Sequence, residues 1–124
     1  MSKVKDDFDL EERLIGFAVR IIQLAEALPK SRVGNHISGQ LIRSGTAPAP
    51  NYGEAQGAES LSDFLHKMKI GLKELRESKV WLKIIIQAKL INPASRLDTL
   101  IDETDQLISI FVKSIKTASM KRQN

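Results

Sequence analysis

The strongest pattern in this sequence is the recurrence of apolar residues at steps of three and four positions. One such series runs through Leu10, Leu14, Phe17, Ala18, Ile21, Leu24, Ala25 and Leu28. This spacing places apolar side chains on one face of an α-helix. The chain has no run with the two-residue period of a strand between hairpin turns. The sequence therefore predicts an all-α protein.

Prolines and capping residues divide the chain into four helices. Pro29 ends the first helix, Ser31 can cap the second, and Pro93 suits the first position of the fourth. Pro48 and Pro50 predict a kink or a break inside the second helix, because proline cannot donate a helical hydrogen bond. Short loops between the helices predict an up-down-up-down antiparallel four-helix bundle. The expected helices cover residues 9–28, 31–57, 61–91 and 93–118.

Length and composition indicate one domain over residues 1–124, with frayed ends at about 1–8 and 119–124. The 42% of apolar residues and 27% of charged residues are typical of a folded chain. The absence of cysteine excludes disulfides, thiolate metal sites and cysteine nucleophiles. No apolar run has the length of a signal peptide core or a membrane span. We expect a cytoplasmic protein that makes no contact with a membrane.

The predicted helix 61–91 carries more apolar surface than one bundle core needs. When residues are placed about 100° apart, one arc forms a core seam and a second apolar arc lies on nearly the opposite side. An exposed apolar patch of that size is unusual on a soluble monomer. We therefore expect a homo-oligomer whose interface contains Ile70, Trp81, Ile84 and Ile85.

A row of basic residues, called here the basic ridge, lies between these two arcs and consists of Lys69, Lys73, Arg76 and Lys83. The ridge is a candidate nucleic-acid contact, and the alternative is an ordinary solvated helix face. Interleaved aromatic residues for base stacking are missing. The net charge is only 19 − 15 = +4. Strong binding would thus require the ridges of several copies to act together.

Five polar residues lie on or beside otherwise apolar surfaces: Arg43, Asn51, Glu54, Glu74 and Glu77. Paired carboxylates can serve as a general acid and base. An arginine that faces glutamates can also form a structural polar cluster that sets helix register, and we favour this interpretation. Arg43 is then expected to be buried or half-buried against Glu54, Glu74 or Glu77.

Motifs for metal ions, cofactors or nucleophiles are absent. A di-iron bundle site needs two Glu-x-x-His pairs, and the nearest match is a single Asp63-x-x-His66. Gly34, Gly39 and Gly45 do not fit a phosphate-binding loop and are interpreted as helix-packing positions. We predict no enzyme, no catalytic residue, no metal and no cofactor.

Several stretches of the chain are similar in order and spacing to one known family. They are residues 28–32 (LPKSR), 40–46 (QLIRSGT), 51–55 (NYGEA), 63–67 (DFLHK) and 72–82 (LKELRESKVWL). Over about residues 17–111 the sequence resembles the four-helix-bundle proteins encoded in intervening sequences of bacterial large-subunit ribosomal RNA genes. The resemblance implies a compact bundle that assembles as a ring-like homopentamer.

The resemblance also implies a relation in fold to the accessory protein of diversity-generating retroelements, a basic pentamer that works with nucleic acid and a reverse transcriptase. We therefore expect a non-enzymatic, nucleic-acid-binding accessory protein. RNA, DNA and a reverse transcriptase are the candidate partners. The alternative is a protein–protein interaction scaffold that binds no nucleic acid.

Overall fold

The computed structural model describes the backbone of residues 2–123 and the side chains of residues 10–121, all in helices and connecting turns. No strand occurs in this part of the chain, and the all-α prediction is confirmed. The frayed ends predicted at about 1–8 and 119–124 lie largely outside the residues whose side chains are described, so this part of the sequence analysis stays a prediction. The elements are α1 (Ser2–Ala27), α2 (Arg32–Thr46), α3 (Pro48–Gln56), α4 (Leu61–Gln87), the 3₁₀ turn η1 (Ala94–Leu97) and α5 (Asp98–Gln123).

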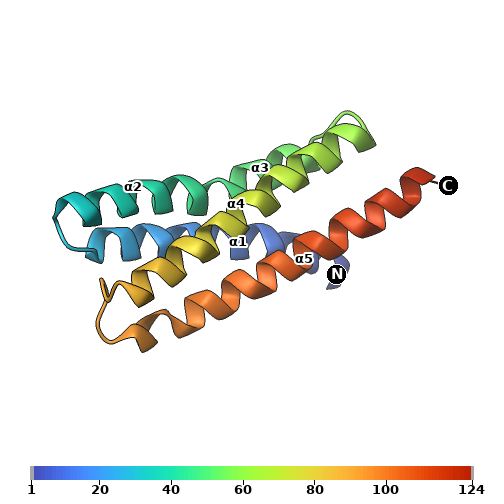
Figure 1. Cartoon of the computed structure of the whole chain (residues 1–124). Helices are drawn as coiled ribbons and strands as arrows, with labels where there is room; N and C mark the ends of the chain where they lie inside the picture. The colour runs from blue at the N-terminus through green and yellow to red at the C-terminus, as the bar shows by residue number, and fades with distance from the viewer. Residues whose placement is uncertain (1, 124) are drawn as a thin grey trace.

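The helices pack around one core in a four-cornered cross-section. Helix α1 packs against α2, α3 and α5, and α4 packs against the same three helices. Within the described residues, the backbone of α1 does not approach that of α4, and the backbone of α5 approaches neither α2 nor α3. Hence α1 and α4 occupy one diagonal, while α2 with α3 and α5 occupy the other. Figure 1 shows α2 and α3 lying end to end along one edge of the bundle.

The core follows a heptad pattern, in which buried positions alternate three and four residues apart. In α4 the buried positions are Leu65, Met68, Gly71, Leu75, Ser78, Leu82 and Ile85. Around α1 they include Leu14, Phe17, Ile21, Leu24 and Leu28, and around α5 Leu97, Leu100, Thr104, Leu107 and Phe111. A period of 3.5 residues is that of knobs-into-holes packing between supercoiled helices.

This period corrects the prediction for Ile85. A wheel drawn at about 100° per residue drifts by about 20° per heptad against a 3.5-residue repeat, which amounts to about 80° over the 27 residues of α4. The drift turns Ile85 into the core, where its exposed fraction is 0%. A side chain buried inside its own bundle offers no surface to a partner, so the assignment of Ile85 to the oligomer interface is wrong. Leu61 shares the heptad position of Met68 and Leu75 but is 38% exposed, because it is the first residue of α4.

The predicted interruption of the second helix is confirmed as a break at Ala47. Pro48 is the first residue of α3, and Pro50 also lies in its first turn, where a missing N–H breaks no intrahelical bond. The Asn51 backbone N–H donates to the Ala47 carbonyl over 3.1 Å. Its side-chain Nδ2 donates to the same oxygen over 3.0 Å. Upstream, Ser31 caps α2 as expected by accepting a hydrogen bond from the Gly34 N–H.

The connection between α4 and α5 differs from the predicted boundaries. Helix α4 ends at Gln87 because Lys89 adopts a left-handed conformation with φ of 56°. The Lys89 N–H donates to Ile86 O and the Leu90 N–H donates to Ile85 O, the two bonds of a Schellman motif. Pro93 does not begin the last helix, because a 3₁₀ turn that buries Leu97 comes first.

Glycines allow two pairs of helices to approach closely. A Cβ atom on Gly45 of α2 would lie 2.6 Å from Ile21 Cγ2 of α1. One on Gly71 of α4 would lie 2.7 Å from Phe111 Cε2 of α5. The interpretation of Gly45 as a packing position is therefore confirmed. A Cβ on Gly39 would meet nothing within 4 Å, so the same interpretation is wrong for that residue.

Candidate nucleic-acid interface

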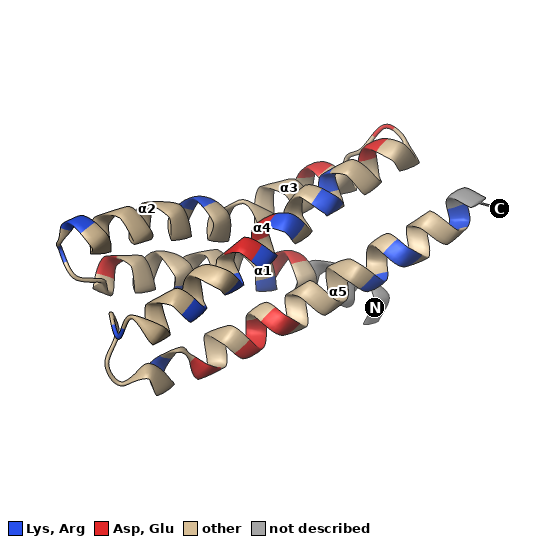
Figure 2. Ribbon diagram, in the orientation of Figure 1, with Lys and Arg blue, Asp and Glu red and all other residues tan. Residues whose placement is uncertain are grey.

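The basic ridge lies on the outer surface of α4, on the side nearer to α5. Two sets of ion pairs fix the rotation of this helix. Lys79 Nζ lies 2.6 Å from Asp105 Oδ1 of α5, whereas Glu74 and Glu77 pair with Arg43 of α2. Lys69, Arg76 and Lys83 share the Lys79 side of the helix, and Lys73 lies toward the outermost line. Figure 2 shows these cations as blue segments along α4.

Charge on the basic ridge is not neutralised by neighbouring side chains. All four ridge residues, Lys69, Lys73, Arg76 and Lys83, are exposed. Within the described side chains, none of them forms an ion pair. The nearest acids of α4 are Glu74 and Glu77, and both are turned toward Arg43. The ridge therefore presents four unpaired cations to solvent.

Acidic residues bound this positive surface on one side. Asp98, Asp102 and Asp105 are exposed on the first half of α5, which Figure 2 shows in red. Asp105 is held by Lys79. On the second half of α5 the exposed charges are the basic residues Lys113, Lys116 and Lys121. A polyanion that follows α4 would meet cations along the ridge and repulsion beyond it, at the start of α5.

The structural polar cluster forms around Arg43 as a link between α2 and α4. Arg43 donates to Glu74 Oε2 over 3.1 Å, to a carboxylate oxygen of Glu77 and to Gln40 Oε1 over 3.1 Å. Glu77 also accepts a 3.0 Å hydrogen bond from Trp81 Nε1. The Arg43 side chain is 50% exposed, so it is half-buried against two of the three predicted glutamates.

Asn51 and Glu54 do not belong to this cluster. Asn51 bonds the backbone at the Ala47 break, as described above. Glu54 Oε1 accepts a 2.7 Å hydrogen bond from Lys67 Nζ. This hydrogen bond and the negative charge of Glu54 raise the pKa of Lys67. Glu54 follows Arg43 by 54 − 43 = 11 residues, or about 16 Å along a helix axis, which is beyond the reach of one side chain.

The predicted interface residues on α4 differ in how far their side chains are exposed. Ile84 is 37% exposed, while Ile70 and Trp81 are half-buried. The Trp81 ring meets His36 of α2 edge to face, with 6.2 Å between the ring centroids. Val80, which the sequence analysis did not single out, is 55% exposed beside them. Its position between the basic ridge and Ile84 makes it part of the outer surface of α4.

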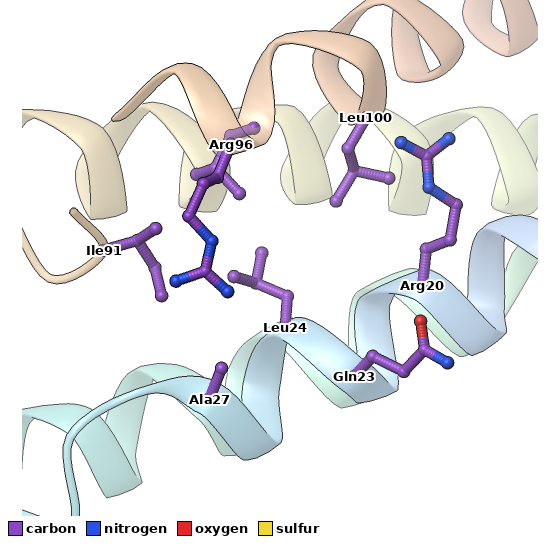
Figure 3. Close-up of a pocket in the computed structure, with 8 residues that line it drawn as sticks. Arg20, Gln23, Leu24, Ala27, Ile91, Arg96 and Leu100 are labelled. Atoms are coloured by element: carbon purple, nitrogen blue, oxygen red, sulfur yellow. The ribbon is translucent and has the colours of Figure 1, made fainter. Parts of the chain in front are cut away.

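A cavity of about 200 Å³ lies between the end of α1 and the start of α5. Figure 3 shows Arg20, Gln23 and Arg96 around an apolar floor that includes Leu24 and Leu100. Arg20 Nη2 donates to Thr99 Oγ1 over 2.7 Å. The lining holds no carboxylate and no histidine, so it offers no pair of groups for acid–base chemistry.

The described residues form neither a metal-ligand cluster nor a membrane-spanning helix. No three His, Asp or Glu side chains among them come together as metal ligands. None of their helices is long and apolar enough to cross a membrane.

Comparison with known proteins places the chain in a family. No curated protein matches the sequence. A solved structure of a protein of unknown function from the S23 ribosomal protein family of Bacteroides thetaiotaomicron superposes with a TM-score of 0.80 at 30% identity. That match covers 86% of this chain and 98% of the other. A family model described as 23S rRNA-intervening sequence protein matches residues 6–113. The chain therefore belongs to the 23S rRNA-intervening sequence protein family.

Proposed function

We propose that this protein is a non-enzymatic, nucleic-acid-binding accessory protein of the cytoplasm. It acts as an up-down-up-down four-helix bundle assembled into a homopentamer, with no metal or cofactor. The observation that carries the proposal is the unpaired charge of the basic ridge. Phosphate contacts made by Lys and Arg supply most of the affinity in sequence-independent binding.

Assembly strengthens this argument. Five copies of a chain with a net charge of +4 would carry 5 × 4 = +20. Ridges repeated around a ring would contact several phosphates at once, so weak contacts add to a useful affinity. RNA and DNA are both candidate ligands, because the ridge offers charge without side chains arranged to read base edges. A reverse transcriptase is a candidate protein partner.

The second candidate is a protein–protein interaction scaffold without nucleic acid. Exposed aliphatic side chains on the outside of the bundle favour it, since Val80 and Ile84 of α4 and Ile15, Val19 and Ile22 of α1 are each more than a third exposed. Aliphatic surface of this extent is a feature of protein-binding faces.

The test is binding of a labelled RNA hairpin and a labelled DNA duplex by fluorescence anisotropy, at about 50 and 200 mM salt. We expect affinity that is similar for unrelated sequences and that falls steeply with salt. On duplex DNA the expected log–log slope is about 0.9 per phosphate neutralised. Lys69→Glu with Arg76→Glu should abolish binding at the higher salt concentration.

Lys113→Glu with Lys116→Glu is the matched control, because it makes the same change in charge on α5. The control should bind more tightly than the ridge variant, and both should keep the oligomeric mass of the unmodified protein. If the control loses binding and the ridge variant does not, the ridge is not the binding surface. If the unmodified protein binds neither nucleic acid even at the lower salt concentration, the scaffold function replaces the proposed one.

A further inference from the structure

The described surface carries a second apolar patch, which the sequence analysis did not identify. It consists of Ile15, Val19 and Ile22 of α1 and Ile42 of α2, with exposed fractions of 36–46%. We call it the α1–α2 patch. The three α1 residues are spaced four and three positions apart, so they form one line on the helix. A line of exposed aliphatic residues at helical spacing is the pattern of a surface that another helix covers.

The α1–α2 patch faces outward from the side of the bundle formed by α1 and α2. Arg13 and Arg20 mark the opposite side of α1, because they bond Glu103 and Thr99 of α5. Ile15 and Val19 are separated from these arginines by about 100° or more around the helix axis, so they point away from α5. Ile42 is similarly turned away from α4, since its neighbour Arg43 is the residue that reaches α4.

The outer surface of α4 carries a different patch, formed by Val80, Trp81 and Ile84 and called here the α4 patch. It lies on the side of the bundle formed by α2 and α4, because Trp81 meets His36 of α2 and bonds Glu77, the partner of Arg43. The basic ridge is turned toward α5, on the next side of the bundle. The α1–α2 patch and the α4 patch therefore lie on different sides of the bundle, and the basic ridge borders the α4 patch on its α5 side.

Charges beside the two patches are opposite in sign. Glu11 and Glu12 are exposed next to Ile15, and neither forms an ion pair with a described side chain. Lys73 and Lys83 are exposed next to the α4 patch and are also unpaired. Opposite charges at the rim favour contact between unlike patches, and like charges oppose contact between two identical ones.

The positions of the two patches on the bundle determine the shape of the oligomer that repeated contacts between copies would form. The side formed by α1 and α2 and the side formed by α2 and α4 meet along α2, at roughly a right angle in a four-cornered bundle. Contacts between unlike patches form a closed ring when the rotation between neighbouring copies closes, and an open helical filament when it does not. A small ring is the closed form that unlike patches at this angle produce.

We infer that copies of this chain assemble through unlike patches, the α1–α2 patch of one copy packing on the α4 patch of the next. The inference rests on the oligomer of the proposed function and specifies its contact. A ring of five copies requires a heterologous interface, and the inference names its two surfaces, of which each copy uses one of each kind. Lys69 and Arg76 of the basic ridge remain accessible, because they face the side shared by α4 and α5, whereas Lys73 and Lys83 lie at the rim of the contact.

The test uses two variants that each lose one patch. Ile22→Glu places a charge in the α1–α2 patch, and Val80→Glu with Ile84→Glu places charges in the α4 patch. Each of these residues is more than a third exposed, so the helices should stay folded, which circular dichroism checks. Val112→Glu is the matched control, since Val112 is a 39% exposed aliphatic residue on α5 outside both patches.

By light scattering, the unmodified protein and the Val112 variant should show the same oligomeric mass. Each patch variant alone should be a monomer of 13.8 kDa. Mixing the two should give a dimer of 2 × 13.8 = 27.6 kDa, because each then supplies the patch that the other lacks. Contact between identical patches cannot give this result, since one of the variants would dimerise alone.

Monomers that stay monomers after mixing would overturn the inference, as would an Ile22 variant that keeps the full oligomeric mass. In both cases the unmodified protein is still an oligomer, so the proposed function is untouched. An unmodified protein that is itself monomeric would overturn the inference and the oligomeric part of the proposed function together. Loss of nucleic-acid binding with an intact ring would contradict the proposed function alone.

Discussion

Lys89 alone decides where α4 ends. Residues other than glycine pay a free-energy cost of about 1–2 kcal/mol in the left-handed region, because Cβ comes too close to the following carbonyl oxygen. Lys89 adopts this conformation with φ of 56° and allows the two Schellman bonds to form. Glycine is the usual sequence signal for such a position, and it is absent here. The predicted helix therefore ran to residue 91 instead of stopping at Gln87.

We predict that Lys89→Gly raises the free energy of unfolding by about 1 kcal/mol, because glycine removes the Cβ contact and keeps the turn. Chemical denaturation measures the change. Lys89→Ala keeps the Cβ atom and removes the charge, so it should give no such gain. Equal stabilisation by both variants would show that the positive charge, and not the backbone conformation, was the unfavourable feature.

Arg43 shows how far a single polar residue could be placed from the sequence. Its partners Glu74 and Glu77 were predicted because charged residues on apolar helix faces need counter-charges. Glu54 was grouped with Arg43 wrongly, because the 11 residues between them span about 16 Å along consecutive helices, which one side chain cannot bridge. Half of the Arg43 side chain stays in solvent, so the pair resembles a surface ion pair more than a buried one.

At the scale of helices, number and order followed from apolar periodicity and prolines. The rotation of each helix about its own axis did not follow from them, because a straight-helix wheel ignores the supercoil that packing imposes. The placement of Ile85 on the outer arc of α4 was therefore wrong. Gly71 and Ser78 occupy core positions without being apolar, so the hydrophobic pattern could not identify them. Ser78 fits because its hydroxyl lies 2.9 Å from both Ser44 Oγ and the Glu74 carbonyl.

Helix spacing leads to a prediction for paired glycine variants. Gly71→Ala should lower the free energy of unfolding by about 1–3 kcal/mol, because the added methyl group overlaps Phe111 and forces α4 and α5 apart. Gly39→Ala should raise it by about 0.5–1 kcal/mol, since alanine restricts the unfolded chain and meets nothing in the folded one. Thermal and chemical denaturation of both variants provide the comparison. Similar effects of the two substitutions would mean that helix propensity, and not the α4–α5 distance, sets the outcome.

At the scale of the whole molecule, the fold class could be predicted and the outer surface only in part. The exposed edge of α4 was identified because helix 61–91 has too many apolar residues for one core, and the basic ridge because its cations fall in a row between the two apolar arcs. The α1–α2 patch was missed because Ile15, Val19 and Ile22 lie among the core residues of the same helix and look like a broader core face. Which row of apolar residues on a helix is buried depends on where the neighbouring helices pack, and the sequence of that helix alone does not show this.

Assembly should make thermal stability depend on concentration. Folded copies that associate are stabilised by mass action, whereas unfolded chains gain nothing. We predict that Tm of the unmodified protein rises when its concentration is increased about 100-fold, and that Tm of the Ile22→Glu variant does not. Differential scanning calorimetry at the two concentrations measures both. A concentration-independent Tm for the unmodified protein would indicate that the subunits fold and melt separately.

The junction at Ala47 interrupts hydrogen bonding but keeps the angular phase of the buried series, which continues from Leu41 and Ser44 to Pro48 and Tyr52. Inserting or deleting one residue there would rotate everything downstream in α3 by about 100° and turn Tyr52 out of the core. The turns at 57–60 and 88–93 have no such phase to preserve. Natural variation in chain length should therefore accumulate in those turns, while the proline junction, although it looks like a loop in the sequence, keeps a fixed residue count.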